Sequence, residues 1–302
     1  MIYMSPVYEL TIPSTGKQML FRPYLVSEEK VLAMASEADD MKSIVTAVKR
    51  IIKATADSPI DVDSLCLFDL EYLFINIRAK SVGEISRVKI ACSDESCNTY
   101  NDVELDLSQT KIVRNGTPDS TLVLSPEVTL TLQYITVSAY ERFDIAKDYD
   151  SSSGETLMKL LAGSIQSING VRATEYPVEE LIAFVESFSR ESIGGIQRYI
   201  ETTPTIQTSI EFKCKKCKKQ NSISVSGIGA FFKVAMAHMS LLNYYKENFA
   251  MMQHHGYSLA ELENMIPWER EIYLALLSEH IVAENKRIAE QNAAAKRGSR
   301  GR

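Results

Sequence analysis

Four of the five cysteines occur as two close pairs whose spacing suits the binding of a metal ion. Cys92 and Cys97 form a C-x4-C pair in KIACSDESC, and Cys214 and Cys217 form a C-x2-C pair in EFKCKKCKKQ. Alternating apolar residues flank both pairs, so we expect each pair to lie in a tight turn between antiparallel strands. Two such turns supply four thiolates for a tetrahedral site. We therefore predict that these four cysteines bind one Zn²⁺ per chain.

The predicted ion is structural, because four thiolate ligands leave no coordination position open for a substrate. It would join residue 92 to residue 217 and contribute directly to the folded state. Lysines surround the second pair and offset the charge of the thiolates; they are Lys213, Lys215, Lys216, Lys218 and Lys219. Two alternatives stay open, namely four reduced thiols without metal, and disulfides or a redox pair. Redox C-x-x-C motifs, however, open a helix rather than a charged strand turn.

The other residues with chemical potential have simpler structural explanations. Cys66 stands alone in the apolar stretch LCLFDLEYLF, and we interpret it as a small buried hydrophobe. His238 lies among Met and Leu residues on a predicted helix, and we interpret it as a core or interface histidine with a hydrogen-bonded ring. His254 and His255 precede a glycine that ends a helix, where they can cap the last carbonyl groups. Neither these three nor His280 has a partner typical of a catalytic or metal-binding motif.

No phosphate-binding or dinucleotide-binding motif is present, since the glycines of GIGAFF are too few for a phosphate loop. Paired acidic residues, Glu28 with Glu29 and Glu179 with Glu180, fall at predicted helix starts, where the helix dipole explains them. We assign no catalytic residues and predict that the chain is not an enzyme and has no small-molecule substrate.

The chain of 302 residues is 45% hydrophobic and 24% charged, which is typical of a soluble globular protein with a full core. A net charge of −6 gives no general attraction to nucleic acid or to an anionic membrane. The start, MIYMSPVYELTIPS, does not resemble a signal peptide, and no apolar run is long enough to predict a membrane span. We expect a protein of the cytosol in which it is made.

The spacing of apolar residues predicts the elements that position the cysteines. A hairpin over 7–25 precedes three helical pieces over 28–82. Alternation with a period of two predicts antiparallel strands over 84–134 and a strand pair over 205–225. Helical spacing over 138–203, with a polar loop at DYDSSSGE, predicts a helical insertion between the two cysteine pairs.

The C-terminal third is predicted to be helical. One long helix runs from Gly229 to about residue 255, where Gly256 ends it. Ser258 and Glu261 form a capping box for a short helix. Pro267 suits the first turn of a last helix, which we extend to about residue 295.

These elements predict an α+β fold in four parts. The parts are 1–83 (N-terminal hairpin plus helices), 84–226 (a zinc-ribbon-like antiparallel β module with its helical insertion at about 138–203), 227–295 (C-terminal helical region) and 296–302 (a basic, disordered tail).

Aromatic and methionine residues recur at helical spacing in the C-terminal third. The pattern is typical of a core stripe, but also of a helix that docks in a groove of a partner protein. The single tryptophan follows Pro267 at the junction of two helices. The candidate partner-binding residues are Phe231, Phe232, Tyr245, Phe249 and Trp268.

Three blocks of the sequence resemble the T4-type bacteriophage baseplate proteins. They are VYELTIPSTGKQMLFRPYLVSEEKVLAMASEAD, FDLEYLFINIRAKSVGE followed by KIACSDESC, and MIPWEREIYLALL, which is similar to the C-terminal segment of baseplate hub and tail assembly proteins. The resemblance implies a non-enzymatic role in contractile-tail assembly, as a baseplate hub subunit or hub assembly factor. The implied partners are other tail and baseplate hub proteins. The implied locations are the host cytoplasm during assembly and the tail baseplate of the virion.

Two other functions compete with this one. The first is a tail assembly chaperone that binds the tape-measure protein and is absent from the mature virion. The second is a zinc-ribbon regulator that binds nucleic acid through the lysines at 213–219. The acidic net charge and the lack of aromatic residues within that lysine run do not favour nucleic acid binding.

Overall fold

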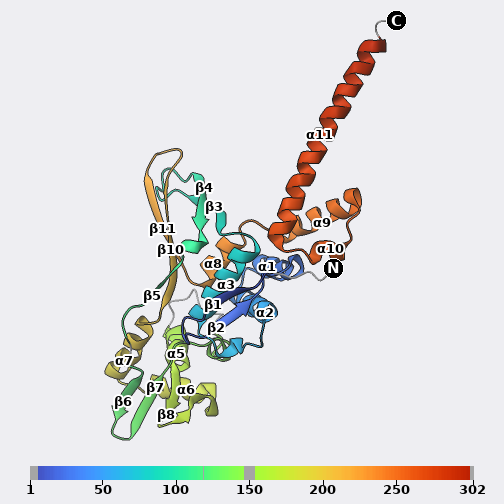
Figure 1. The fold of residues 1–302 in the computed structure, drawn as a ribbon. Coiled ribbons are helices and arrows are strands. Elements are labelled where there is room, and N and C mark those ends of the chain that lie inside the picture. Colours follow the sequence, from blue (N-terminus) through green and yellow to red (C-terminus); the bar gives the residue numbers. More distant parts are fainter. Residues whose placement is uncertain (1–5, 118, 146–153, 300–302) are drawn as a thin grey trace.

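The chain forms a central body from which a pair of long hairpins and a single long helix project (Figure 1). A computed structural model describes residues 6–117, 119–145 and 154–299. Helices and small sheets alternate along the chain, and every strand pairing within these ranges is antiparallel. The α+β class predicted from the sequence is confirmed.

The first part of the chain forms a hairpin followed by three helices, as the sequence predicts. The elements are β1 (Tyr8–Thr11), β2 (Gln18–Phe21), α1 (Val26–Ala38), α2 (Met41–Thr55) and α3 (Leu67–Ser81). Asp69, in the first turn of α3, accepts hydrogen bonds from the backbone amide and the hydroxyl of Ser14 at 2.9 and 2.5 Å. These bonds attach the turn of the hairpin to the start of α3.

Helix α3 is the centre of the body because it is apolar on two sides. Leu73, Phe74 and Ile77 pack in the larger core, together with α1 and α2. Phe68 and Ile75 pack in a smaller second core formed by the later strands. The helix therefore couples the hairpin of the N-terminus to the strands that carry the cysteines.

Those strands form two long hairpins that lie beside each other (Figure 1). The elements are β3 (Ile85–Ala91), β4 (Tyr100–Asp106), β5 (Lys111–Val113), β10 (Thr205–Lys213) and β11 (Gln220–Ser226). β3 pairs with β4, and β10 lies between β11 and β5. Val103 and Leu105 of the first hairpin and Ile210 of the second bury their side chains in the second core, so apolar packing holds the two hairpins together.

A separate sheet and its helices lie between these hairpins in sequence. The strands, in spatial order, are β6 (Thr121–Ser125), β7 (Val128–Leu132), β8 (Ile165–Ile168) and β9 (Val171–Arg172). The helices are α4 (Val137–Arg142), α5 (Gly154–Gly163), α6 (Val178–Glu186) and α7 (Arg190–Glu201). Short 3-10 turns occur at Val62–Ser64, Leu107–Gln109 and Ala173–Glu175. The predicted polar loop DYDSSSGE lies largely outside the described residues.

The prediction that residues 138–203 form helices joined by a polar loop is wrong at one point, because β8 and β9 form a hairpin there. Asn169 and Gly170 form its turn with φ angles of 50° and 82°. Asn-Gly is the commonest sequence for a two-residue turn of this hand, so the signal was present but was outweighed by helical spacing on either side. β8 then pairs with β7 and completes the sheet.

The C-terminal third is helical, with one break more than the sequence predicts. Its elements are α8 (Ile228–Ala235), α9 (Leu241–His255), α10 (Leu259–Glu263) and α11 (Pro267–Ser299). The single long helix predicted up to residue 255 is divided because the Ser240 hydroxyl accepts from the Asn243 amide and starts a new helix. The capping box at Ser258 and Glu261 is confirmed.

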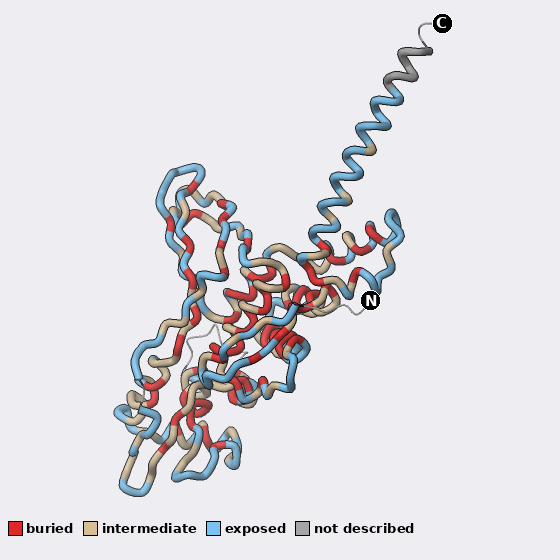
Figure 2. Tube along the Cα trace, in the orientation of Figure 1, coloured by how far each residue is buried: buried red, intermediate tan, exposed pale blue. Residues whose placement is uncertain are grey.

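Helix α11 projects from the body and is exposed over most of its length (Figure 2). It continues through residues 296–299, for which the sequence predicts a disordered tail. The division of the chain at residues 83, 226 and 295 stays a prediction. No helix in the described part of the chain is long and apolar enough to cross a membrane.

Candidate metal centre

The tips of the two long hairpins bring all four predicted metal ligands together. Cys92 and Cys97 lie in the turn between β3 and β4, here called the first cysteine turn. Cys214 and Cys217 lie in the turn between β10 and β11, the second cysteine turn. All four Sγ atoms lie within 4.8 Å of one another. Within the described ranges, no other group of three or more metal-binding side chains is close enough to share an ion.

Two short distances between sulfur atoms connect the two turns. Cys92 Sγ lies 3.5 Å from Cys217 Sγ, and Cys97 Sγ lies 3.7 Å from Cys214 Sγ. A Zn²⁺ bound tetrahedrally at about 2.3 Å from each sulfur holds the sulfurs about 3.8 Å apart. All four cysteines are free thiols. The spacing of the sulfurs therefore fits a single tetrahedral ion, with two ligands from each turn.

The backbone of the two cysteine turns follows one pattern. The amide of Cys92 donates to Thr99 O at 3.0 Å, and the amide of Cys214 donates to Lys219 O at 2.9 Å. The residue after the second cysteine is left-handed in both turns, with φ of 41° at Asn98 and 62° at Lys218. A lysine in this region is uncommon because its Cβ crowds the backbone.

The first turn contains two more residues between its cysteines, and Asp94 accommodates them. Its Oδ1 accepts from the amide of Ser96 at 3.0 Å and from the Ser96 hydroxyl at 2.6 Å, which closes a local side-chain turn. The amide of Cys97 also donates to Asp94 O at 2.9 Å. The longer C-x4-C turn can thereby place its two sulfurs on the same side as the shorter C-x2-C turn does.

The thiols of Cys214 and Cys217, both in the second cysteine turn, have pKa values shifted in opposite directions. Backbone amides of Cys217 and Lys216 that point at the Cys214 sulfur lower the pKa of Cys214 to about 6. The pKa of Cys217 is lowered by the amide of Lys219 but raised more by desolvation and by the three neighbouring thiols, to about 12. Thiolates packed this closely repel one another, whereas a divalent cation at their centre stabilises all four.

The charges around the centre are divided between the two turns. The five lysines of residues 213–219 are exposed. The first turn carries the acidic residues Asp94 and Glu95. Asp102, on β4 beside this turn, has its Oδ2 3.8 Å from Lys215 Nζ. Lys218 Nζ donates instead to Lys215 O at 2.9 Å, within its own turn.

Cys66 and His238 lie apart from this centre. Cys66 precedes α3, and burial raises the pKa of its thiol to about 12. It is half-buried against the second core, which agrees with its interpretation as a hydrophobe. Both ring nitrogens of His238 have partners, Ala235 O at 3.0 Å and Glu29 Oε1 at 2.9 Å, so the prediction of a hydrogen-bonded ring is confirmed.

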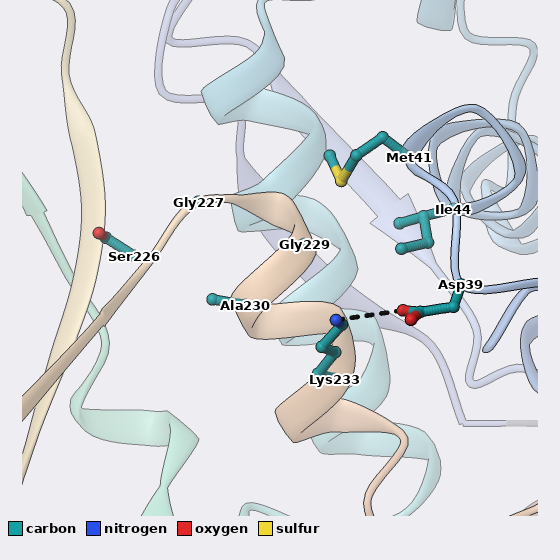
Figure 3. Close-up of a pocket in the computed structure, with 8 residues that line it drawn as sticks. All are labelled: Asp39, Met41, Ile44, Ser226, Gly227, Gly229, Ala230 and Lys233. Atoms are coloured by element: carbon teal, nitrogen blue, oxygen red, sulfur yellow. Dashed lines mark ion pairs between the residues drawn. The ribbon is translucent and has the colours of Figure 1, made fainter. Parts of the chain in front are cut away.

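A surface hollow at the start of α8 has no catalytic arrangement of side chains (Figure 3). Its two charged residues, Lys233 and Asp39, form an ion pair with each other at 3.1 Å. The other lining residues are Met41, Ile44, Ser226, Gly227, Gly229 and Ala230. The hollow thus offers neither an acid–base pair nor a nucleophile with a base.

The structure divides the five candidate partner-binding residues into two sets. Phe231 and Phe232 are 0% and 1% exposed, and Phe232 stacks on Phe74 with ring centroids 5.7 Å apart. Side chains buried in the core of their own chain cannot contact a partner, so we correct their assignment to core residues. Tyr245, Phe249 and Trp268 are 52%, 65% and 36% exposed and stay candidates.

Sequence reasoning missed the role of Glu29, which it explained by the helix dipole. Glu29 is fully buried, and its carboxylate contacts His238 and Arg270. Its partners lie more than 200 positions away in the sequence, so local patterns carry no signal for this cluster.

Comparisons with known proteins match two parts of the chain to phage proteins. Residues 5–233 match the family described as T4 bacteriophage base plate protein. Residues 240–281 match the family described as Baseplate hub assembly protein Gp51 C-terminal domain. No curated protein and no solved structure matches the chain significantly.

Proposed function

This chain belongs to the family of T4 bacteriophage base plate proteins, and we propose from this premise how it acts. Its residues 240–281 match the C-terminal domain of a baseplate hub assembly protein. Its role in the phage baseplate is structural or concerned with assembly. We propose that it performs this role through an exposed apolar surface on its C-terminal helices. A structural zinc ion would stabilise the hairpins of the body. A role of this kind requires no catalysis.

The observation that carries the proposal is a group of exposed large apolar side chains, here called the C-terminal apolar surface. Its members are Leu242, Tyr245, Phe249 and Met252 on α9 and Trp268, Ile272, Tyr273 and Leu276 on α11. The members on α9 recur at intervals of three and four residues, which places them on one side of that helix. Exposed apolar patches on soluble proteins commonly mark sites of protein–protein contact.

The composition and position of this surface support a partner from the baseplate hub. Aromatic residues and methionine are enriched at the centres of protein interfaces, and Trp and Tyr dominate their binding energy. All eight residues lie within 240–281, the part that matches the hub assembly domain. We propose that the occupant is another baseplate hub protein that offers an apolar groove.

The role of the metal follows from its ligands. A tetrathiolate ion would tie the tip of the β3–β4 hairpin to the tip of the β10–β11 hairpin, and its four ligands leave no site for a substrate. Outside the tips, the hairpins share the small second core. Zinc would therefore fix their relative position without taking part in chemistry.

Capture of hub proteins by the full-length tagged chain from phage-infected cells tests the proposed surface. The Phe249→Ala and Tyr245→Ala variants should lose hub proteins, while Glu279→Ala, an exposed change on α11, should retain them. Equal capture of hub proteins by all variants would refute the proposal that this surface binds them. Mass spectrometry of purified virions then separates a resident hub component, whose peptides are present, from the alternative of an assembly chaperone, whose peptides are absent.

A further inference from the structure

Two buried asparagines occupy matching positions beside the candidate metal centre. Asn101 on β4 and Asn221 on β11 each lie four residues after the second cysteine of their own turn. They are 4% and 2% exposed. A neutral amide is costly to bury unless its donor and acceptor are both bonded. Their burial at equivalent places in both hairpins therefore calls for specific partners.

Each asparagine reaches across to the opposite cysteine turn. Asn101 Oδ1 accepts from the backbone amide of Lys215 at 2.8 Å, and Asn221 Oδ1 accepts from the backbone amide of Ser93 at 2.8 Å. Lys215 and Ser93 each follow the first cysteine of their turn. The two bonds are reciprocal and relate the turns by an approximate two-fold symmetry.

The other end of each amide is bonded within its own turn. Asn101 Nδ2 donates to Thr99 O, and Asn221 Nδ2 donates to Lys219 O, both at 2.9 Å. A backbone amide can only donate and a carbonyl can only accept, so these partners determine the orientation of both side chains. Thr99 and Lys219 are the residues whose carbonyls close the two turns onto Cys92 and Cys214.

Asparagine suits this position better than its close relatives. Serine is too short to connect both partners, and aspartate would add negative charge next to four thiolates. Asn101 Nδ2 also lies 3.8 Å from Cys214 Sγ, a cysteine of the opposite turn. Hydrogen bonds of this kind around a metal site orient the ligands and support the affinity for the ion.

We propose that Asn101 and Asn221 are positioning residues that join the two cysteine turns independently of the metal, so that the four sulfurs are gathered before an ion binds. The inference rests on the zinc site proposed above. It predicts that loss of either asparagine weakens zinc binding by about 10- to 100-fold. The hairpins themselves remain folded because they also share an apolar core.

Zinc affinity of the full-length chain, measured by competition with a chromophoric chelator, tests the proposal. Asn101→Ala and Asn221→Ala should each bind zinc about 10- to 100-fold more weakly than the unaltered chain. Ser86→Ala is the matched control. Ser86 is equally buried on β3, and its hydroxyl donates to Val234 O at 2.6 Å, away from the cysteine turns. This variant should lose stability but keep its zinc affinity.

Hydrogen exchange of two backbone amides in the zinc-free chain provides the second measurement. Asn221→Ala should accelerate exchange at Ser93 and spare Lys215, and Asn101→Ala should do the reverse. Loss of protection at both amides in each variant would mean that the hairpins simply unfold and would overturn the proposal. Unchanged zinc affinity in the asparagine variants, or an equal loss in Ser86→Ala, would also overturn it. Failure of the unaltered chain to bind zinc would instead remove the metal site and this inference with it.

Discussion

His238 Nε2 lies 2.9 Å from Oε1 of Glu29, a fully buried carboxylate 209 positions earlier in the chain. The other oxygen of Glu29 lies 3.4 Å from Nη2 of Arg270, which is also buried and lies 3.5 Å from Glu247. Next to this cluster, the amide of Val26 donates to Met265 O at 2.9 Å. Helix α1 of the body is thereby attached to α9 and α11, which carry the C-terminal apolar surface.

Glu29→Gln should destabilise the chain by about 3–5 kcal/mol, because it leaves Arg270 buried without its closest negative charge. The free energy of unfolding, measured in urea, checks this. Glu104→Gln is the control, since it breaks the Arg87–Glu104 pair, whose side chains are 82% and 63% exposed, and should cost less than about 1 kcal/mol. Similar losses in the two variants would show that the buried cluster has no special role.

The carboxyl group of Glu71 should make stability depend on pH. Glu71 is 7% exposed, its Oε1 has no hydrogen-bond partner, and burial raises its pKa from 4.5 to about 8. The folded state therefore holds this proton more tightly than the unfolded state, so the free energy of unfolding falls as the pH rises from about 4.5 to about 8.

Glu71→Gln should remove this pH dependence. We expect the variant to be about 1–3 kcal/mol more stable than the unaltered chain near pH 9 and similar to it near pH 4. Melting temperatures at the two pH values measure the difference. A constant offset between the two proteins at both pH values would exclude titration of Glu71 as its cause.

Removal of zinc should lower stability and free four thiols from the ion. With free zinc at about 100 times its Kd, loss of the ion lowers the free energy of unfolding by about 2.7 kcal/mol. Cys214→Ser should reproduce this loss and leave Cys92, Cys97 and Cys217 open to thiol reagents. Cys66→Ser, a change outside the centre, should keep the bound metal. Full stability and retained metal in Cys214→Ser would contradict a site with four thiolates.

Two phenylalanines of the C-terminal third should respond in opposite ways. Phe232→Ala should cost about 3–5 kcal/mol of stability, because the ring is buried against Phe74. Phe249→Ala should change stability by less than about 0.5 kcal/mol but weaken binding to a hub protein by about 10-fold or more. Calorimetric unfolding and titration with the captured partner measure the two effects. A large loss of stability in Phe249→Ala would assign its ring to the core instead.

Local patterns predicted those features that depend on neighbours in sequence. The strands around the cysteine pairs, the glycine that ends α9 and the capping box at Ser258 all follow from residues within a few positions of one another. The hairpin at Asn169 and Gly170 could have been predicted in the same way, because Asn-Gly is a local turn signal. The break at Ser240 was also signalled by a residue that favours helix starts.

By itself, the sequence determined which residues could form a metal centre and that the chain is built from helices and antiparallel strands, because residue type and periodicity act locally. Only the tertiary structure decided that the sulfurs of both turns share one centre, that Asn101 and Asn221 connect those turns, and that Phe232 is buried while Phe249 is exposed. Each of these depends on contacts between segments far apart in the chain. Such contacts arise from the packing of whole elements, and a residue's own type and spacing do not encode its distant partner.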